Sequence, residues 1–164
     1  MKNIPTEKIT NSWEEIGKAI KEGKVVVVPT DTVFGILGNA LNKETVEKIY
    51  RIKKRKPAKP YIILIPDVSF LSIFGIKPDE IEKTLLETKG ITVVLKLPED
   101  KKNKFFYLHR GTGSLAFRIP KKDELIKILK EIRLPVVAPS ANPEGEKTAT
   151  TTEEAFKYFG KNID

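Results

Sequence analysis

Apolar residues follow two patterns, which alternate along the whole chain. Short continuous runs, rich in β-branched residues, predict strands buried in a sheet at 25–28, 61–65, 91–97 and 135–138. Between these runs, apolar residues recur every three or four positions, which predicts helices at 13–22, from 43 through at least 50, and at 78–87, 124–132 and 152–159. Strands and helices that intermix in this way favour an α/β fold, with helices packed against a twisted mixed sheet.

Capping residues mark the ends of several predicted helices. Ser12 followed by Glu15, and Thr151 followed by Glu154, form capping-box patterns in front of apolar stripes. Single residues suit the remaining ends: Asn42 and Asp123 as N-caps, Gly23 and Gly90 as helix stops.

Residues 114–119 alternate instead, so Leu115, Phe117 and Ile119 face the predicted core. Ser114 and Arg118 then share the opposite face, about 13 Å apart at roughly 3.3 Å per residue. Either both side chains line a ligand groove, or Arg118 extends into solvent from the edge of the sheet. The preceding segment, 98–113, is long and polar, and we expect it to be a mobile loop.

The composition narrows the class of protein. The chain has 164 residues, of which 40% are hydrophobic and 32% charged, so we expect one folded domain over 1–164. No apolar run approaches the roughly 18 residues of a membrane span. The start, MKNIPTEKIT, has no apolar signal core, which predicts a cytoplasmic protein without membrane partners. The absence of cysteine excludes disulfides and thiol catalysis, and a single histidine, His109, excludes a histidine-rich metal site.

Positive charge is concentrated in one stretch. The net charge is +8, and residues 48–60, KIYRIKKRKPAKP, contain seven Lys and Arg without an acidic residue. Such a stretch suits phosphate oxygens, either of a nucleoside triphosphate or of a nucleic acid. The alternative is a solvated helix end followed by a proline turn. No Walker motif is present.

Two predicted strands end in proline and then in small polar residues. The first reads VVVVPTDTVFGILG from residue 25, and the second reads VVAPSAN from residue 136. Ligands of α/β sheets bind at strand ends, so the two loops form one site if both strands point the same way. Otherwise they are ordinary capped turns on the surface.

Taken together, these stretches resemble the YrdC-like family of threonylcarbamoyl-AMP synthases. The matching motifs, in order, are PTDTVFG, the K-x-R of Lys53 and Arg55, SLAFRIP, and APSAN with a Thr-rich tail. The resemblance covers roughly Trp13 to Phe159 and implies a YrdC-like domain with a basic concave cleft. It also implies the short form of the family, without an extra C-terminal domain.

The resemblance implies a nucleotidyl transfer in which L-threonine, bicarbonate and ATP, with Mg²⁺, give threonylcarbamoyl-AMP and pyrophosphate. Separate transferase proteins then use this product to modify adenosine 37 of tRNAs that read codons beginning with A. By motif, the threonine contacts are Thr32, the backbone at Ala138, and Arg118. The ATP contacts are Lys53, Arg55, Lys59, Ser114, Ser140, Asn142 and Thr148. Lys53 and Arg55 are the expected catalytic residues, acting by positioning and charge neutralisation, and no protein metal site is expected.

Three positions depart from the family pattern. Phe34 replaces a usual tyrosine, Glu144 stands where a serine is usual, and Leu64 stands where longer relatives often have histidine. These departures keep open a paralogue with a different nucleotide-dependent activity. A second alternative is an RNA-binding module, in which tRNA or double-stranded RNA lies along the basic cleft.

Overall fold

The computed structural model describes residues 4–164. The prediction that the N-terminus has no signal core rested on residues 1–10. The first three of these residues lie outside the described range. Within it, no helix is long and apolar enough to cross a membrane.

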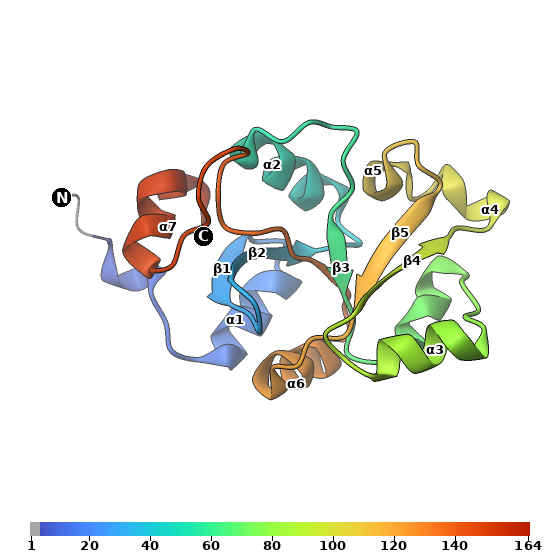
Figure 1. Ribbon diagram of the computed structural model, residues 1–164. Helices are drawn as coiled ribbons and strands as arrows, with labels where there is room; N and C mark the ends of the chain where they lie inside the picture. Colours follow the sequence, from blue (N-terminus) through green and yellow to red (C-terminus); the bar gives the residue numbers. More distant parts are fainter. Residues whose placement is uncertain (1–3) are drawn as a thin grey trace.

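Among residues 4–164, six strands form one mixed sheet (Figure 1). In spatial order they are β1 (Val26–Pro29), β2 (Phe34–Asn39), β6 (Val136–Val137), β3 (Ile62–Leu64), β5 (Ser114–Arg118) and β4 (Thr92–Lys96). Only β3 and β5 run parallel, and every other neighbouring pair is antiparallel. The predicted α/β fold with a mixed sheet is therefore confirmed.

Helices cover both faces of the sheet. The longer ones are α1 (Trp13–Lys21), α2 (Lys43–Lys53), α3 (Glu80–Glu87), α6 (Asp123–Ile132) and α7 (Thr152–Phe159). The shorter ones are α4 (Glu99–Lys102), α5 (Phe106–His109) and the 3₁₀ turns η1 (Thr6–Lys8), η2 (Val68–Phe74) and η3 (Gly160–Asn162). In Figure 1, α2 and α5 lie above the sheet, whereas α1 and α6 lie below it. Two apolar clusters result. In one, the sheet packs against α2, α3, α5, α7 and η2, and in the other it packs against α1 and α6.

One strand was missed by the sequence analysis. The sequence analysis predicted no strand for Phe34–Asn39, but this segment is β2, which pairs with both β1 and β6. Gly38 is needed for packing: a Cβ there lies 2.7 Å from Thr45 Cγ2 and 2.8 Å from Ile49 Cδ1 of α2. The glycine thus lets α2 approach the sheet closely.

The helix caps agree only in part with the sequence. Ser12, Asn42 and Thr151 accept the expected N3 backbone hydrogen bonds. Glu154, however, binds the N–H of Thr150 rather than that of the cap residue. Asp123 is wrong as a cap, since it is the first residue of α6 and the N-cap position, Lys122, makes no side-chain cap bond. The complete capping box lies on α3, between Asp79 and Glu82; Gly90 lies beyond the end of that helix and donates to Ile119 O.

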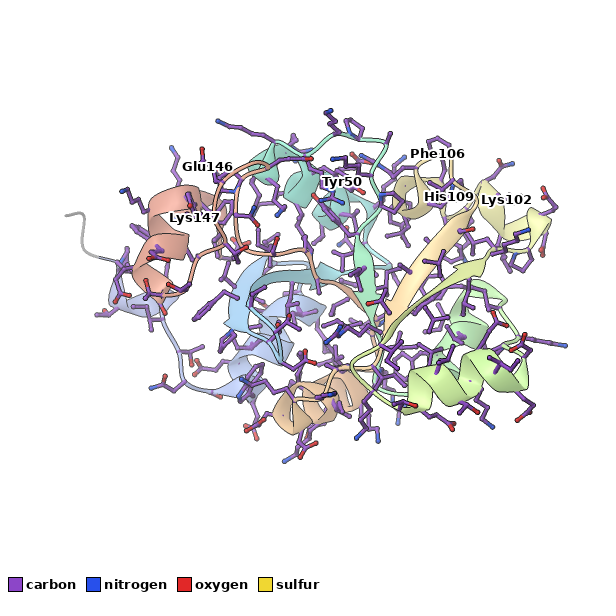
Figure 2. The ribbon with its side chains drawn as sticks, viewed as in Figure 1. Tyr50, Lys102, Phe106, His109, Glu146 and Lys147 are labelled. Carbon is purple, nitrogen blue, oxygen red and sulfur yellow. The ribbon has the colours of Figure 1, made fainter. Side chains whose placement is uncertain are left out.

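The segment 98–113 is also different from the expectation, because it folds into α4 and α5 rather than a polar loop. Tyr107 is buried and donates its hydroxyl hydrogen to Ala40 O at 2.8 Å. His109 is buried as well: its Nε2 lies 2.8 Å from Lys102 O, and its Nδ1 accepts two backbone N–H bonds, from Gly111 and Gly113. Figure 2 shows His109 and Phe106 at the opposite end of the molecule from Glu146 and Lys147.

Gly38→Ala tests the close approach of α2 to β2. We expect it to lower the free energy of unfolding by about 1–3 kcal/mol, because the new methyl group overlaps Ile49 and Thr45. Urea denaturation measures this loss. Ile49→Val removes the nearest Ile49 carbon, so it should cost less in the Gly38→Ala background than in the wild type; strictly additive costs contradict the proposed overlap.

Candidate functional site

The two proline-terminated loops lie side by side. β1 and β6 are both antiparallel to β2, so they run in the same direction and end at the same edge of the sheet. Ser140 forms a bridge with Gly35, and a Cβ on Gly35 lies 3.0 Å from Thr30 Cγ2 and 3.6 Å from Pro139 O. The expectation that both loops belong to one place in the fold is confirmed.

Lys53, the last residue of α2, is buried with only 2% of its surface exposed. Its Nζ donates to Ser140 O at 2.5 Å and to Asn142 Oδ1 at 3.3 Å. Ser140 Oγ and Asn142 Oδ1 are also in contact, at 2.5 Å. Burial, with the nearby charge of Arg55, lowers the pKa of Lys53 to about 8, and the carboxylate of Glu144 opposes this shift. Lys53 therefore ties the end of α2 to the loop after β6.

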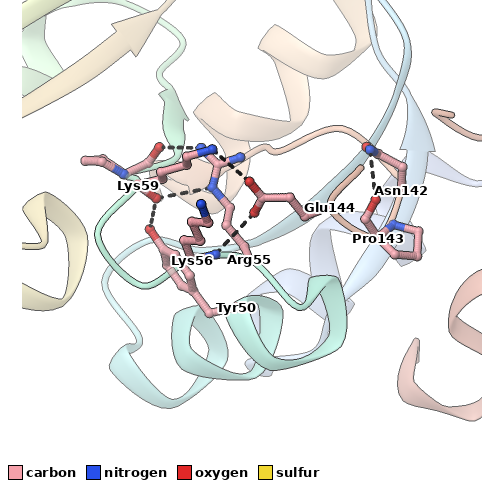
Figure 3. A network of polar contacts seen from close by, with 8 residues as sticks. Tyr50, Arg55, Lys56, Lys59, Asn142, Pro143 and Glu144 are labelled. Atoms are coloured by element: carbon pink, nitrogen blue, oxygen red, sulfur yellow. Dashed lines mark hydrogen bonds and ion pairs between the residues drawn. The ribbon is translucent and has the colours of Figure 1, made fainter. Parts of the chain in front are cut away.

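The basic turn, residues 54–60, is held in a fixed shape by its own cations (Figure 3). Arg55 donates from Nε to Lys59 O and from Nη2 to Pro60 O, both at 3.2 Å, and its guanidinium lies 5.0 Å from the ring centre of Tyr61. Tyr50 donates its hydroxyl hydrogen to Lys59 O at 2.6 Å. The side chain of Lys59 remains half exposed at the end of the turn.

Glu144 joins this turn to the loop after β6. Its carboxylate lies 2.8 Å from Lys59 Nζ and accepts the backbone N–H of Lys56 at 3.2 Å. These two hydrogen bonds hold the pKa of the Glu144 carboxyl below its ordinary value. Its own backbone N–H donates to Lys53 O at 2.8 Å. The residue that departs from the family pattern thus lies directly among the predicted phosphate ligands.

A row of the sheet is left open beside these loops. Ile62, Ala116 and Val94 lie opposite one another on β3, β5 and β4, with Ile62 38% and Val94 67% exposed. Ala138, which donates to Ile62 O, continues the row. On the same face, α1 and α6 cover only neighbouring positions such as Leu64. We refer to Ile62, Val94, Ala116 and Ala138 as the open row.

Ser114 and Arg118 flank the open row, as their shared face requires. The parallel register of β3 and β5 places Pro60, and with it the end of the basic turn, level with Ser114. At the other end, Arg118 Nη2 is paired with Asp31 Oδ2 at 3.0 Å, and both side chains are largely buried. The same Asp31 oxygen accepts the N–H of Lys121 at 3.0 Å.

Asp31 is the residue of this region whose role the sequence analysis did not establish. Burial raises the pKa of its carboxyl, but the hydrogen bond from Lys121 N–H, the bond from Arg118 and the charge of Arg118 together lower it. The sequence signal was Arg118 itself: an arginine on an apolar strand suggests a nearby carboxylate, but it does not say which one. Thr32 is exposed on the same loop, and its hydroxyl lies 3.2 Å from Thr30 Oγ1.

The remaining predicted positions lie at the border of this region. Thr148 is half-buried beside Ala149, whose N–H donates to Ala141 O. Phe34 lines a cavity of about 470 Å³ between α1, α7 and the N-terminal segment, away from the open row. No group of three His, Asp or Glu side chains within residues 4–164 is arranged to hold a metal ion.

Comparison with known proteins connects this geometry to a family. The family model Sua5_yciO_yrdC, described as "Telomere recombination", matches residues 18–164. The chain is 31% identical over 154 residues to "Threonylcarbamoyl-AMP synthase" of Bacillus subtilis, an alignment that covers 90% of this chain and 44% of that protein. The chain therefore spans less than half the length of that relative.

Solved structures share the fold. P. abyssi Sua5 complexed with L-threonine superposes with a TM-score of 0.81 at 28% identity, covering 93% of this chain and 45% of that one. Full-length HypF, in a phosphate- and nucleotide-bound form, gives a TM-score of 0.76 at 28% identity, covering 94% of this chain and 20% of that one.

Asp31→Asn tests the pair with Arg118. The ionised carboxylate stabilises the fold above the unfolded pKa of 3.8, and this stabilisation is lost as pH falls through the lower folded pKa. We expect a loss of about 1–3 kcal/mol at pH 7 that shrinks below pH about 3.5. Denaturation at a series of pH values measures it, with the exposed Asp100→Asn as the matched control. A difference between wild type and Asp31→Asn that stays constant down to pH about 2 contradicts the assignment.

Proposed function

Because the chain belongs to the Sua5/YciO/YrdC family, we propose that it is an L-threonylcarbamoyladenylate synthase, a nucleotidyltransferase that uses L-threonine, bicarbonate and ATP. Its products are threonylcarbamoyl-AMP and pyrophosphate. The former supplies the threonylcarbamoyl group of adenosine 37 in tRNAs that read codons beginning with A, through separate transferase proteins. One observation carries the proposal: the cations predicted for ATP and for threonine border the same open row of the sheet.

The ATP end of the site is the side of the basic turn. Arg55 and Lys59 bind phosphate oxygens, and the loop with Ser140, Asn142 and Thr148 binds the nucleoside part, with Ser114 beside the turn. Lys53 acts mainly by holding this loop, since its ammonium group already donates to Ser140 O and Asn142 Oδ1. Its positive charge still lies close enough to favour phosphate binding.

The threonine end lies at Arg118. Among residues 4–164, Arg118 makes its one side-chain hydrogen bond from Nη2 to Asp31, which leaves Nε and Nη1 as donors for a substrate carboxylate. Asp31 thus orients the guanidinium and occupies only one of its nitrogen atoms. Thr32 and the backbone at Ala138 border the same space and hold the rest of the amino acid.

The chemistry needs positioning more than a dedicated catalytic base. The threonine amine attacks bicarbonate to give a carbamate with loss of water, and a carbamate oxygen then attacks the α-phosphate of ATP with departure of pyrophosphate. Arg55 and Lys59 stabilise the negative charge of that leaving group. When bound with the nucleotide, Mg²⁺ would neutralise further phosphate charge. No group of three acidic side chains among the described residues is arranged to hold it, so phosphate oxygens and water would be its ligands.

Two alternatives have different support. The likeness to one part of HypF favours a relative with another nucleotide-dependent reaction, and Phe34 and Glu144 agree with such a divergence. RNA binding is less well supported, since it gives no role to the buried Arg118–Asp31 pair or to the two proline-terminated loops that meet at one edge of the sheet.

Pyrophosphate release from ATP and Mg²⁺ tests the proposed reaction directly. We expect release only when L-threonine and bicarbonate are both present, with threonylcarbamoyl-AMP identified by its mass. Release that ignores threonine supports the HypF-like alternative. A folded, ATP-binding protein that releases nothing argues against any synthase.

Arg118→Ala separates the two ends of the site. We expect the KM for threonine to rise about tenfold or more, because a bidentate donor to the carboxylate is lost, while the KM for ATP changes less than about twofold. Arg118→Lys should recover only part of the affinity, since an ammonium group cannot make the forked contact. Arg51→Ala, an exposed change of equal charge on α2, is the control. An equal rise in both KM values removes Arg118 from the threonine end.

A further inference from the structure

The carboxylate of Glu144 lies among groups that bind anions. It accepts the backbone N–H of Lys56 at 3.2 Å and the ammonium of Lys59 at 2.8 Å, while the Arg55 guanidinium is close enough to act on it electrostatically. Figure 3 shows the carboxylate between Lys59 and the backbone of Lys56. We call these three donors, Lys56 N–H, Lys59 and Arg55, the anion cradle.

The anion cradle has the chemistry of a phosphate site. A backbone N–H outside regular structure, an ammonium group and a nearby guanidinium are the donors that phosphate oxygens prefer, and each bond to an ionised acceptor is stronger than a neutral one. The Lys56 N–H has a single hydrogen, so a carboxylate and a phosphate cannot both accept it, although the Lys59 ammonium has three hydrogens to share. Any phosphate that binds to the Lys56 N–H must therefore displace Glu144 from it.

We propose that the anion cradle is a polyphosphate subsite and that Glu144 is its internal competitor, leaving when the polyphosphate binds and returning as pyrophosphate departs. The inference rests on the proposed function for the identity of the nucleotide, and it adds a determinant of affinity that follows from this chain's own glutamate. It also adds the Lys56 backbone N–H to the site.

The backbone around Glu144 allows this exchange. Its N–H is bonded to Lys53 O, so the main chain stays fixed while the side chain turns. Gly145 follows with a φ of +89° and open space around it, since no atom lies within 4 Å of an added Cβ. The side chain of Glu144 is already 27% exposed and that of Lys59 52%, so displacement breaks two hydrogen bonds without opening the core.

Competition by a single carboxylate discriminates between phosphates by charge. A triphosphate brings several negative charges and more acceptors than one carboxylate, so it displaces Glu144, whereas a monophosphate has little advantage over it. After the reaction, the adenylate product stays attached to the other loop. Pyrophosphate alone then competes with Glu144, which speeds its release and limits its rebinding.

Binding of inorganic tripolyphosphate and pyrophosphate to the full chain tests the proposal without any catalytic step. Isothermal titration at one fixed salt concentration compares wild type, Glu144→Gln and Glu146→Gln. Glu146 is the matched control because it is an exposed carboxylate on the same loop that contacts Asn142 through its backbone carbonyl. We expect Glu144→Gln to bind both anions roughly fivefold more tightly, and Glu146→Gln to stay within about twofold of wild type.

Weaker or unchanged binding of polyphosphate by a folded Glu144→Gln variant overturns the proposal. Glu144 would then hold the basic turn in the shape that binds phosphate instead of competing with phosphate. A second measurement uses the unaltered protein: the ¹³Cδ NMR signal of Glu144 should move when tripolyphosphate is added. A signal that stays in place while tripolyphosphate binds also overturns the proposal.

These outcomes are independent of the proposed synthase reaction. Tighter polyphosphate binding by Glu144→Gln, together with pyrophosphate release that ignores threonine, supports the internal competitor and rejects the synthase. Threonine-dependent pyrophosphate release, together with no gain in polyphosphate binding by Glu144→Gln, supports the synthase and rejects the internal competitor.

Discussion

The structure around the candidate site depends on one buried positive charge. The ammonium group of Lys53 has almost no contact with water, and leaving it without acceptors costs several kcal/mol. Ser140 O and Asn142 Oδ1 provide these acceptors from a loop 87 and 89 residues further along the chain. The requirement to solvate one cation therefore fixes the end of α2 against the end of β6, and the open row lies beside this junction.

Much of the architecture could be predicted from apolar periodicity, because most elements bury one simple stripe. The burial of Lys53 could have been predicted in the same way. Val46, Ile49, Tyr50 and Lys53 stand at i, i+3, i+4 and i+7 on α2, so they lie on one face of the helix. We counted Lys53 with the six other cations of its stretch, although its helical phase placed it on the buried stripe. What no local pattern contains is the identity of its acceptors, which come from another part of the chain.

The sequence predictions that were wrong or incomplete also depended on contacts between distant parts of the chain. In Phe34–Asn39, Gly38 is required because α2 packs closely upon β2, a tertiary reason that composition cannot separate from turn formation. In 98–113, the many polar residues hide the pattern of Phe105, Tyr107 and Leu108, which are buried at the start of the short helix α5 and within it. Arg118 was correctly placed on its face, but its partner Asp31 could be identified only once the loop after β1 was seen to fold back over β5.

The position of β6 also governs when the sheet can exist. This strand is only Val136–Val137, yet within the described range 4–164 it alone joins β1–β2 to β3–β5–β4 in the sheet. During synthesis on a ribosome, the first 130 or so residues can form two separate strand groups with their helices, but not one sheet. The sheet becomes continuous only after these two valines have been synthesised, and the acceptors of the Lys53 ammonium, on Ser140 and Asn142, follow them within five residues.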